Sequence, residues 1–194
     1  MAGRSIRGFI LASASPRRQQ LLASAGLDFE VEPSRAVEEH VPGEDPAHAA
    51  MRLARAKAFD VFARRPGSLV LAADTVVAVD DRILGKPKSP AEAEKMLELL
   101  SGRAHRVVTG VCLLGPDRDE TFHVSTEVVF RPLGAEEIRA YVKTGEPMDK
   151  AGAYAIQGGA AGFVREIHGS YTNVVGLPLA ECLERLRSGA HRRG

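Results

Sequence analysis

The sequence contains no tryptophan, and aromatic residues make up only 5% of its 194 positions. Proteins that bind single-stranded nucleic acid stack the bases on aromatic side chains, so this composition argues against that class. Lysine and arginine number 26 against 25 aspartates and glutamates, which leaves a net charge of +1. Because no bulk positive field is present to attract nucleic acid, any site for an anion must be local.

Cysteine and long hydrophobic runs are also scarce. The two cysteines, Cys112 and Cys182, are too few for a disulfide framework or a four-cysteine zinc site, and we expect both to be free thiols in the core. No two of the six histidines stand in the HExxH or HxH spacing of a zinc site. No run approaches the ~18 apolar residues of a membrane helix, and the apolar stretch near the N-terminus is too short for a secretory signal. These absences favour a cytoplasmic protein that acts on a small molecule, with no nucleic acid or membrane as partner.

Predicted strands and helices alternate along the chain, a pattern typical of α/β proteins. Strands are expected at residues 8–13, 28–33, 69–73, 76–79, 105–114 and 121–131. Helices are expected at residues 16–25, 48–64, 90–100, 134–145 and 178–187. The last two strands form a long hairpin, which adds an antiparallel part to the sheet. The glycine-rich segment 149–178 has no helical periodicity and is expected to be a functional loop. We expect a single domain over residues 1–194.

The first candidate site lies where a predicted strand leads into a helix. Ser13, Ser15, Arg17 and Arg18 stand there, with Ser15 expected as the helix cap. A helix N-terminus offers free backbone N–H groups and a positive dipole to an anion, and two guanidinium groups add bidentate contacts to phosphate oxygens. The alternative is an ordinary helix start with two solvated arginines, since the sequence contains neither GxxxxGK[ST] nor GxGxxG.

Carboxylates form a second group of candidates. Asp74 and Thr75 interrupt an apolar run, and a carboxylate in such a place is usually paired, metal-bound or catalytic because its burial is otherwise costly. The alternative is a turn at the end of a strand. Glu38 and Glu39 are candidates to hold a divalent cation together with Asp74, because hard cations prefer carboxylate oxygens. The alternative for these adjacent glutamates is solvated charge on a loop.

Two lysines and an amide complete the candidates. Lys57 lies in a predicted helix and Lys86 in a turn, and a lysine ammonium suits either a phosphate or a solvated surface. Gln157 stands in the glycine-rich segment, where its amide could read a base edge or orient water, or where the glycines serve only a tight turn. A serine hydrolase is disfavoured because no GxSxG motif is present.

Several motif blocks follow one another across nearly the whole chain. They are LASASPRRQQLL, LARAKA, AADTVV, LGKPKSPAEAEKMLELLSGRAHRVVTGV, STEVVF, EPMDKAGAYAIQG and GSYTNVVGLPL. In this order they resemble the Maf family, which is understood as a family of nucleoside triphosphate pyrophosphatases. The last two blocks resemble the branch that acts on dTTP and UTP rather than the branch that acts on 7-methyl-GTP. Ala155 replaces a glycine often found there, a change expected to alter backbone freedom only slightly.

The resemblance implies a role for each candidate residue. The implied substrate-binding residues are Ser13, Arg17, Arg18, Lys57 and Thr75. The implied catalytic residues are Asp74, Lys86 and Gln157. Glu38 or Glu39 would join Asp74 around a Mg²⁺ or Mn²⁺ ion, and the pair does not align uniquely. The resemblance also implies a homodimer and an elongated mixed sheet flanked by helices, with a central cleft between two lobes, similar to inosine triphosphate pyrophosphatases.

The expected reaction is metal-assisted hydrolysis of the α–β phosphoanhydride of dTTP, UTP or a modified pyrimidine nucleotide. Asp74 would serve as metal ligand or general base, and the products would be the monophosphate and pyrophosphate. The alternative is a regulatory protein of cell division that senses a nucleotide in the same cleft without turning it over.

Overall fold

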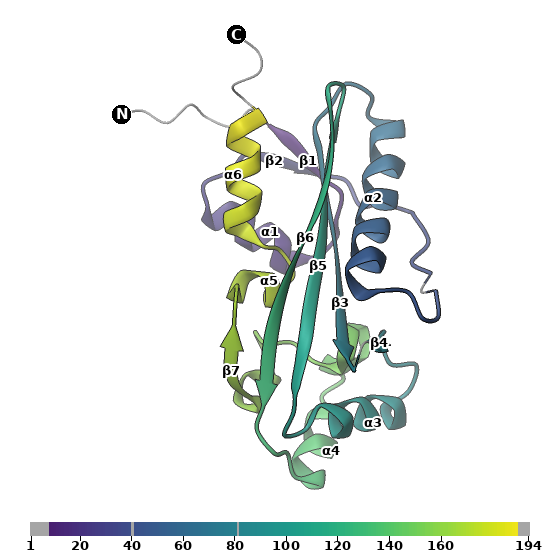
Figure 1. The fold of residues 1–194 in the computed structure, drawn as a ribbon, viewed down its shortest axis with the longest axis vertical. Coiled ribbons are helices and arrows are strands. Elements are labelled where there is room, and N and C mark those ends of the chain that lie inside the picture. Colours follow the sequence, from purple (N-terminus) through teal and green to yellow (C-terminus); the bar gives the residue numbers. More distant parts are fainter. Residues whose placement is uncertain (1–7, 40, 81, 190–194) are drawn as a thin grey trace.

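The fold is organised around one mixed sheet, drawn in Figure 1. The computed structural model describes residues 8–39, 41–80 and 82–189. Seven strands take the order β2-β1-β3-β5-β6-β7, with β4 paired to β3 off that path. The strands are β1 (Phe9–Leu11), β2 (Phe29–Val31), β3 (Val70–Val79), β4 (Arg82–Leu84), β5 (Ala104–Gly115), β6 (Arg118–Phe130) and β7 (Val164–His168). β1 is parallel to β2 and β3, and the remaining pairs are antiparallel, which confirms the α/β class and the long hairpin.

Helices flank the sheet. They are α1 (Pro16–Ser24), α2 (Pro46–Arg64), α3 (Pro90–Leu100), α4 (Ala135–Lys143), α5 (Tyr171–Val175) and α6 (Leu179–Gly189), with 3₁₀ turns η1 (Glu146–Asp149), η2 (Ala151–Ala153) and η3 (Gly159–Phe163). Asp45 accepts hydrogen bonds from the N–H groups of Ala47 and His48, so α2 begins at Pro46, before the expected start. Ser89 caps α3 as predicted. Among the described helices, none combines the length and the hydropathy of a membrane span.

The expected break between residues 69–73 and 76–79 does not exist. A single strand, β3, runs through Asp74 and Thr75, because β5 pairs with it continuously from residue 70 to residue 78. The alternative of a turn at Asp74 is therefore wrong. The two polar side chains lie in mid-strand on opposite faces of the sheet, where each needs a partner.

The glycine-rich segment 149–178 is more regular than a loop. It contains η2 and η3, the strand β7 and the helix α5. Among the described strands, β7 pairs with β6 alone, and the register of that pair shifts between Val129 and Phe130. α5 has five residues, too few for a helical pattern to show in a sequence. Both elements depend on contacts with the sheet, so the sequence alone did not predict them.

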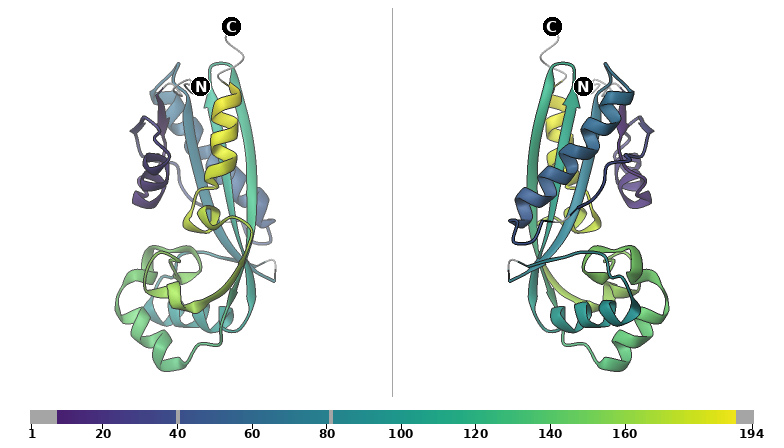
Figure 2. Two further views of the ribbon diagram at one scale, coloured as in Figure 1. Left: turned by 90° about the vertical axis from the view of Figure 1, so that its left-hand side faces the viewer. Right: turned by 90° about the vertical axis from the view of Figure 1, so that its right-hand side faces the viewer.

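Two layers of helices cover the upper half of the sheet in Figures 1 and 2. Successive side chains of β3 point to opposite faces. Ala72 packs in a cluster with Ala58 of α2 and with Cys112. On the opposite face, Leu71 packs in a cluster with Cys182 of α6. Thus α2 lies on one face and α1 and α6 on the other, and both cysteines are buried free thiols, as expected.

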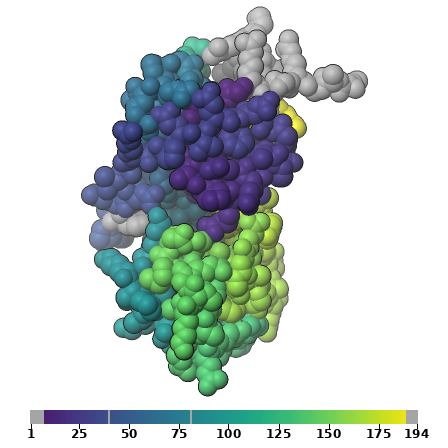
Figure 3. All heavy atoms as spheres, turned by 180° about the vertical axis from the view of Figure 1, so that it is seen from behind, coloured from purple at the N-terminus to yellow at the C-terminus, as the bar shows by residue number. Residues whose placement is uncertain are grey.

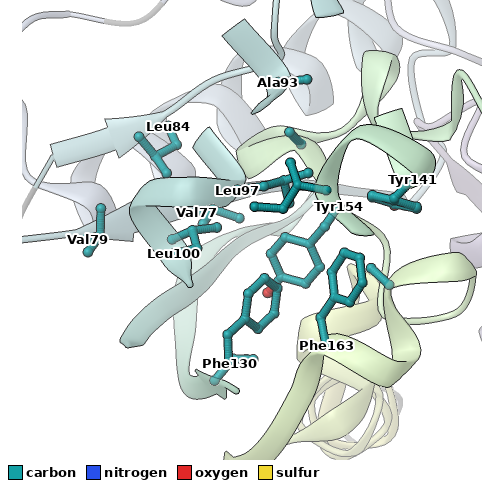
Figure 4. Packing of buried hydrophobic residues seen from close by; sticks show 14 of the residues in the cluster. Val77, Val79, Leu84, Ala93, Leu97, Leu100, Phe130, Tyr141, Tyr154 and Phe163 are labelled. Atoms are coloured by element: carbon teal, nitrogen blue, oxygen red, sulfur yellow. The ribbon is translucent and has the colours of Figure 1, made fainter. Parts of the chain in front are cut away.

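The lower half of the sheet carries a second lobe. α3, α4 and the 3₁₀ turns pack there around the rings of Phe130, Tyr154 and Phe163, which meet edge to face (Figure 4). The lower ends of β3, β5 and β6 contribute Val77, Val107 and Phe130 to the same core. These three strands therefore run through both lobes (Figure 1). The result is an elongated mixed sheet flanked by helices, as the family resemblance implied.

Candidate active site

The candidate site forms at a gap on one edge of β3. On that edge β1 pairs with Val70 and Leu71, and β4 pairs with residues 77–79, so no described strand lies beside residues 72–76. The other edge of β3 is paired with β5 along nearly its whole length. The ends of β1 and β4 therefore flank the middle of β3, and their following residues converge on this gap.

On the α2 face of β3, a buried ammonium joins two carboxylates. Lys57 Nζ, from α2, donates a hydrogen bond to Asp74 Oδ1 at 2.5 Å and lies 2.6 Å from Glu38 Oε1. Lys86 Nζ, just beyond β4, donates to Glu38 Oε2 at 3.0 Å. Lys57 is 9% exposed and Asp74 is 6% exposed. The structure thus brings Asp74, Lys57, Lys86 and Glu38 into one chain of ion pairs, which we call the ammonium cluster.

The ammonium cluster keeps Glu38 charged. Burial alone would raise the pKa of Glu38, but hydrogen bonds and charge from Lys57 and Lys86 outweigh it and lower that pKa to about 2. Asp74 contacts Lys57 through Oδ1. Its second oxygen, Oδ2, accepts no hydrogen bond from the described residues and is not sealed from solvent. Oδ2 is therefore available to a ligand or a water molecule.

On the opposite face of the sheet, Arg18 ties the end of β1 to β3. Its Nη1 donates to Ser13 Oγ and its Nη2 to Thr75 Oγ1, both at 3.1 Å, while Nε donates to the Gly176 carbonyl at 2.8 Å. Burial lowers the pKa of Arg18, and the charge of Asp74 opposes that shift, so the two faces of the site interact electrostatically. Two of the five guanidinium N–H groups make no hydrogen bond with the part of the chain that the structure describes.

The first turn of α1 lacks the side-chain cap that the sequence suggested. Ser15 occupies the cap position, but its side chain makes no capping hydrogen bond, which corrects the expectation. Its backbone N–H instead donates to Ser13 Oγ at 3.2 Å. The half-buried Arg17 makes no hydrogen bond or ion pair with the described residues. An uncapped first turn and a free guanidinium lie together, which is the arrangement that an anion site requires.

Sequence reasoning missed two polar residues behind Thr75. Thr75 Oγ1 lies 2.9 Å from Thr109 Oγ1, and Thr109 Oγ1 donates to the Asn173 carbonyl at 3.2 Å. Thr109 and Asn173 are both fully buried. A hydrogen-bonded chain thus runs from Arg18 through β3 and β5 to α5. Thr109 interrupts an apolar run just as Asp74 does, so the same pattern could have revealed it.

Two predicted residues stand apart from these contacts. Gln157 is exposed, and among the described residues no hydrogen bond joins its side chain to the ammonium cluster or to the arginine contacts. Glu39 is also exposed, and its carbonyl accepts a hydrogen bond from Arg52 Nη2 at 2.9 Å. Of the two adjacent glutamates, it is Glu38 that the structure brings to the ammonium cluster.

The donor set fits a cation that completes its coordination with substrate. Mg²⁺ takes oxygen ligands and is commonly held by one or two carboxylates, with water and phosphate oxygens in the remaining positions. Asp74 and Glu38, held by the same ammonium, supply two such carboxylates. Within the described ranges, no group of three or more His, Cys, Asp or Glu side chains is arranged for a metal. A cation held by these two carboxylates would therefore complete its coordination with water or phosphate oxygens.

Residues of both lobes lie near the gap in β3. In the view from behind, the N-terminal segment in purple lies directly above residues of the 140–160 region in green (Figure 3). Two hollows of about 300 and 470 Å³ both border Asp80, away from the ammonium cluster. The first is lined by His105 and Glu127 among others, and the second by Val41 and Arg82. Neither hollow is lined by a residue of the ammonium cluster, so the candidate site at the sheet edge is distinct from both.

Known proteins share these motif blocks. The family model of Maf-like proteins matches residues 8–189. A dTTP/UTP pyrophosphatase of Geobacter sulfurreducens is 57% identical over 180 residues, which cover 92% of this chain and 94% of that protein. Proteins with the same name from Symbiobacterium thermophilum and Bacillus cytotoxicus are 52% and 50% identical over 177 and 182 residues, covering 91% and 94% of this chain and 91% and 95% of those proteins. With matches over nearly its whole length, the chain belongs to the Maf family.

Proposed function

We propose that this chain is a nucleoside triphosphate pyrophosphatase that hydrolyses dTTP, UTP and modified pyrimidine nucleotides of the same kind. One observation carries the proposal: Asp74, buried in mid-strand, keeps a free oxygen beside the gap while Lys57 holds the other. A carboxylate with a free oxygen can take the proton of an attacking water molecule, and the cations around it can bind a triphosphate. The names of the relatives support the choice of base.

The triphosphate binds across the gap in β3. Arg17 and the uncapped first turn of α1 approach its phosphates from the end of β1, and Lys86 approaches from the end of β4. Arg18 offers its two remaining N–H groups, because Ser13 and Thr75 hold the guanidinium in place from the protein side. These cations neutralise the charge that spreads over the phosphates in the transition state.

Asp74 acts on the attacking water. Its Oδ2 accepts a proton as the water oxygen bonds to the α-phosphorus. The bond from that phosphorus to the bridging oxygen then breaks, which releases the monophosphate and pyrophosphate. Lys57 holds Oδ1, which leaves Oδ2 for the water molecule. Gln157 contacts the base or the water from the second lobe.

A Mg²⁺ or Mn²⁺ ion bound by Asp74 and Glu38 would polarise the phosphate and make the bound water more acidic. Lys86 Nζ lies 3.0 Å from Glu38 Oε2 and helps to fix the position of this carboxylate. We expect removal of divalent cations by a chelator to abolish turnover, and added Mg²⁺ or Mn²⁺ to restore it. Full activity after chelation would contradict the role of the cation.

The decisive experiment compares Asp74→Asn with Asp119→Asn. Pyrophosphate and monophosphate release are measured from dTTP, UTP, CTP and 7-methyl-GTP. Asp74→Asn keeps the shape of the side chain but removes the proton acceptor, so we expect turnover to fall about 10²–10⁴-fold while the circular dichroism spectrum stays unchanged. Asp119 forms an exposed ion pair with Arg55, and its variant is a matched control that should retain activity.

The nucleotide panel also distinguishes the rival functions. Turnover of dTTP and UTP by the wild type supports the proposal, whereas a preference for 7-methyl-GTP would contradict the proposed base. Binding of a nucleotide without turnover would favour the regulatory sensor of cell division. Normal activity in Asp74→Asn would contradict the assignment of Asp74.

The remaining expectations concern the state of the protein in the cell. We propose that residues 1–194 form one domain with two lobes, that the chain forms homodimers, and that it works in the cytoplasm. The two buried, unpaired thiols support a reducing compartment. Sedimentation equilibrium would test the homodimer, and a monomer at micromolar concentration would contradict it.

A further inference from the structure

The segment that carries Gln157 is fastened on both sides to one pair of residues. Ala155 N donates a hydrogen bond to Tyr141 Oη at 3.3 Å, and Gly159 N donates to Glu146 Oε2 at 3.1 Å. The pair is itself joined, because Tyr141 Oη donates to Glu146 Oε1 at 2.9 Å. Gln157 therefore lies between two fixed backbone groups.

The backbone next to Gln157 lies directly on this pair. A Cβ atom on Gly158 would come within 2.1 Å of Glu146 Oε1, and one on Gly159 would come within 3.0 Å of the ring of Tyr141. A side chain at residue 158 would therefore force the Glu146 carboxylate to move. The contact sets the path of the chain on one side of Gln157, and the hydrogen bond of Ala155 sets it on the other.

The pair is anchored in the core of the lower lobe. Tyr141, in α4, is 5% exposed, and its ring meets Phe163 edge to face at 5.2 Å (Figure 4). Burial raises the pKa of Tyr141, so its hydroxyl keeps its proton and donates a hydrogen bond to Glu146. Glu146 N donates to Thr144 Oγ1 at 3.2 Å, directly after Gly145 with its φ of 77°. Both partners thus have fixed positions.

The fastened segment lies within electrostatic reach of the candidate site. Burial is the main cause that raises the pKa of Tyr141, and the charge of Arg17 acts against it. The pKa of Asp149 is lowered first by its hydrogen bond with Lys150 and further by the same Arg17 charge. The start of α1 therefore faces the lobe that carries Gln157, as the purple and green regions of Figure 3 do.

We propose that Tyr141 and Glu146 are positioning residues that hold the amide of Gln157 toward a nucleotide bound in the β3 gap. The inference rests on the proposed function, because Gln157 needs a bound nucleotide to act on. Neither Tyr141 nor Glu146 touches the substrate. Their effect passes through the backbone of residues 155–159.

The matched variants Tyr141→Phe and Tyr154→Phe test this role. Each loses one buried hydroxyl from the same core, but Tyr154 Oη is bonded to His105 Nε2 at 2.8 Å rather than to the segment. We expect amide hydrogen exchange at Ala155 to become at least tenfold faster in Tyr141→Phe and to stay unchanged in Tyr154→Phe. Equal exchange in the two variants would overturn the inference, whether or not the protein hydrolyses nucleotides.

Kinetics with dTTP provide the second readout. We expect kcat/KM to fall at least tenfold in Tyr141→Phe, mainly through kcat, and to stay within twofold of wild type in Tyr154→Phe. In a Gln157→Ala background, Tyr141→Phe should cause no further loss, because the residue that it positions is already gone. Losses that multiply in the double variant would overturn the inference. A wild type without turnover would instead overturn the proposed function.

Glu146 is tested by an isosteric change. In Glu146→Gln, the amide oxygen can accept only one of the two hydrogen bonds, and the amide N–H groups face the other donor. Glu137→Gln is the matched control, since Glu137 pairs with Arg131 on the surface of the same lobe. We expect a loss of kcat in Glu146→Gln alone, and equal kcat in the two variants would remove Glu146 from the positioning role.

Discussion

At the scale of single residues, the site depends on one ammonium shared by two acids. Lys57 Nζ lies 2.5 Å from Asp74 Oδ1 and 2.6 Å from Glu38 Oε1. Removal of one partner from a buried ion pair leaves an uncompensated charge, which typically costs about 3–5 kcal/mol. The ammonium thus allows two carboxylates to lie close together in one small site, as the proposed chemistry needs.

The lowered pKa of Glu38 predicts how this contact depends on pH. The folded value is about 2 against an ordinary 4.5, so the charged form is favoured by folding. Its contribution to stability is therefore fully present above pH 4.5 and is lost as the pH falls toward 2. The free energy of unfolding is measured by urea denaturation for wild type and Glu38→Gln between pH 2 and 7. The difference in free energy of unfolding between wild type and Glu38→Gln should be greatest above pH 5 and should vanish near pH 2.

The neighbouring glutamate supplies the control for this measurement. The side chain of Glu38 is 38% exposed, so solvent screening limits the difference to about 1 kcal/mol. Glu39 has no contact with Lys57 or Lys86 among the described residues, and Glu39→Gln should show no such pH dependence. If the free energy of unfolding of Glu38→Gln differed from wild type by the same amount at every pH, the ion pairs of Glu38 with Lys57 and Lys86 would not be its cause.

Sequence patterns located Asp74 but not all of its surroundings. A carboxylate inside the apolar run AADTVV stands out because its burial is costly. Nothing in the sequence distinguishes Glu38 from Glu39, since an irregular segment has no period that fixes the direction of its side chains. Thr109 also interrupts an apolar run, but the strand register is what places it opposite Thr75.

At the scale of elements, one glycine allows α2 to lie directly on the sheet. Gly110 in β5 stands opposite Asp74 in the strand register. A Cβ atom there would lie 2.3 Å from the backbone carbonyl of Ala50 and 2.4 Å from Met51 N. The close approach brings α2 to the face of β3 on which Lys57 meets Asp74.

Gly110→Ala should therefore disturb both the packing and the site. Because the new methyl group meets helix backbone rather than a flexible side chain, α2 must move away from β5. We expect a loss of about 3 kcal/mol in the free energy of unfolding, measured by urea denaturation, together with lower turnover. Gly115→Ala on the same strand is the control, since its nearest contact is the Leu69 side chain at 3.4 Å. Equal losses in the two variants would contradict the role of Gly110.

Local patterns predicted elements well where local interactions decide them. Proline at the first helical position and the Ser89 cap marked α3, and the alternation of residues 121–131 marked β6. β3 was expected as two strands because its polar centre suggests a turn, but continuous pairing with β5 overrides that local preference. β7 was missed because it is an edge strand fixed by one neighbour.

At the scale of the whole molecule, the two lobes share their central strands. In β3, Leu71 belongs to the upper core and Val77 to the lower core. In β5, Val111 belongs to the upper core and Val107 to the lower core. Unfolding of either lobe would therefore expose apolar residues of strands that the other lobe requires. The gap in β3 lies between these two cores, so its geometry depends on both.

This shared sheet predicts one cooperative unfolding transition, although a chain of 194 residues exceeds the size at which two-state behaviour is usual. The chain carries a probe in each lobe. Cys112 and Cys182 lie in the upper cores, where burial raises the pKa of both thiols and keeps them unreactive. Tyr141 and Tyr154 lie in the lower core and give a near-ultraviolet circular dichroism signal. Thiol reactivity and this signal, followed in urea, should change at one midpoint. Loss of the tyrosine signal before the thiols react would show that the lower lobe unfolds alone, and the site would then depend on two domains rather than one.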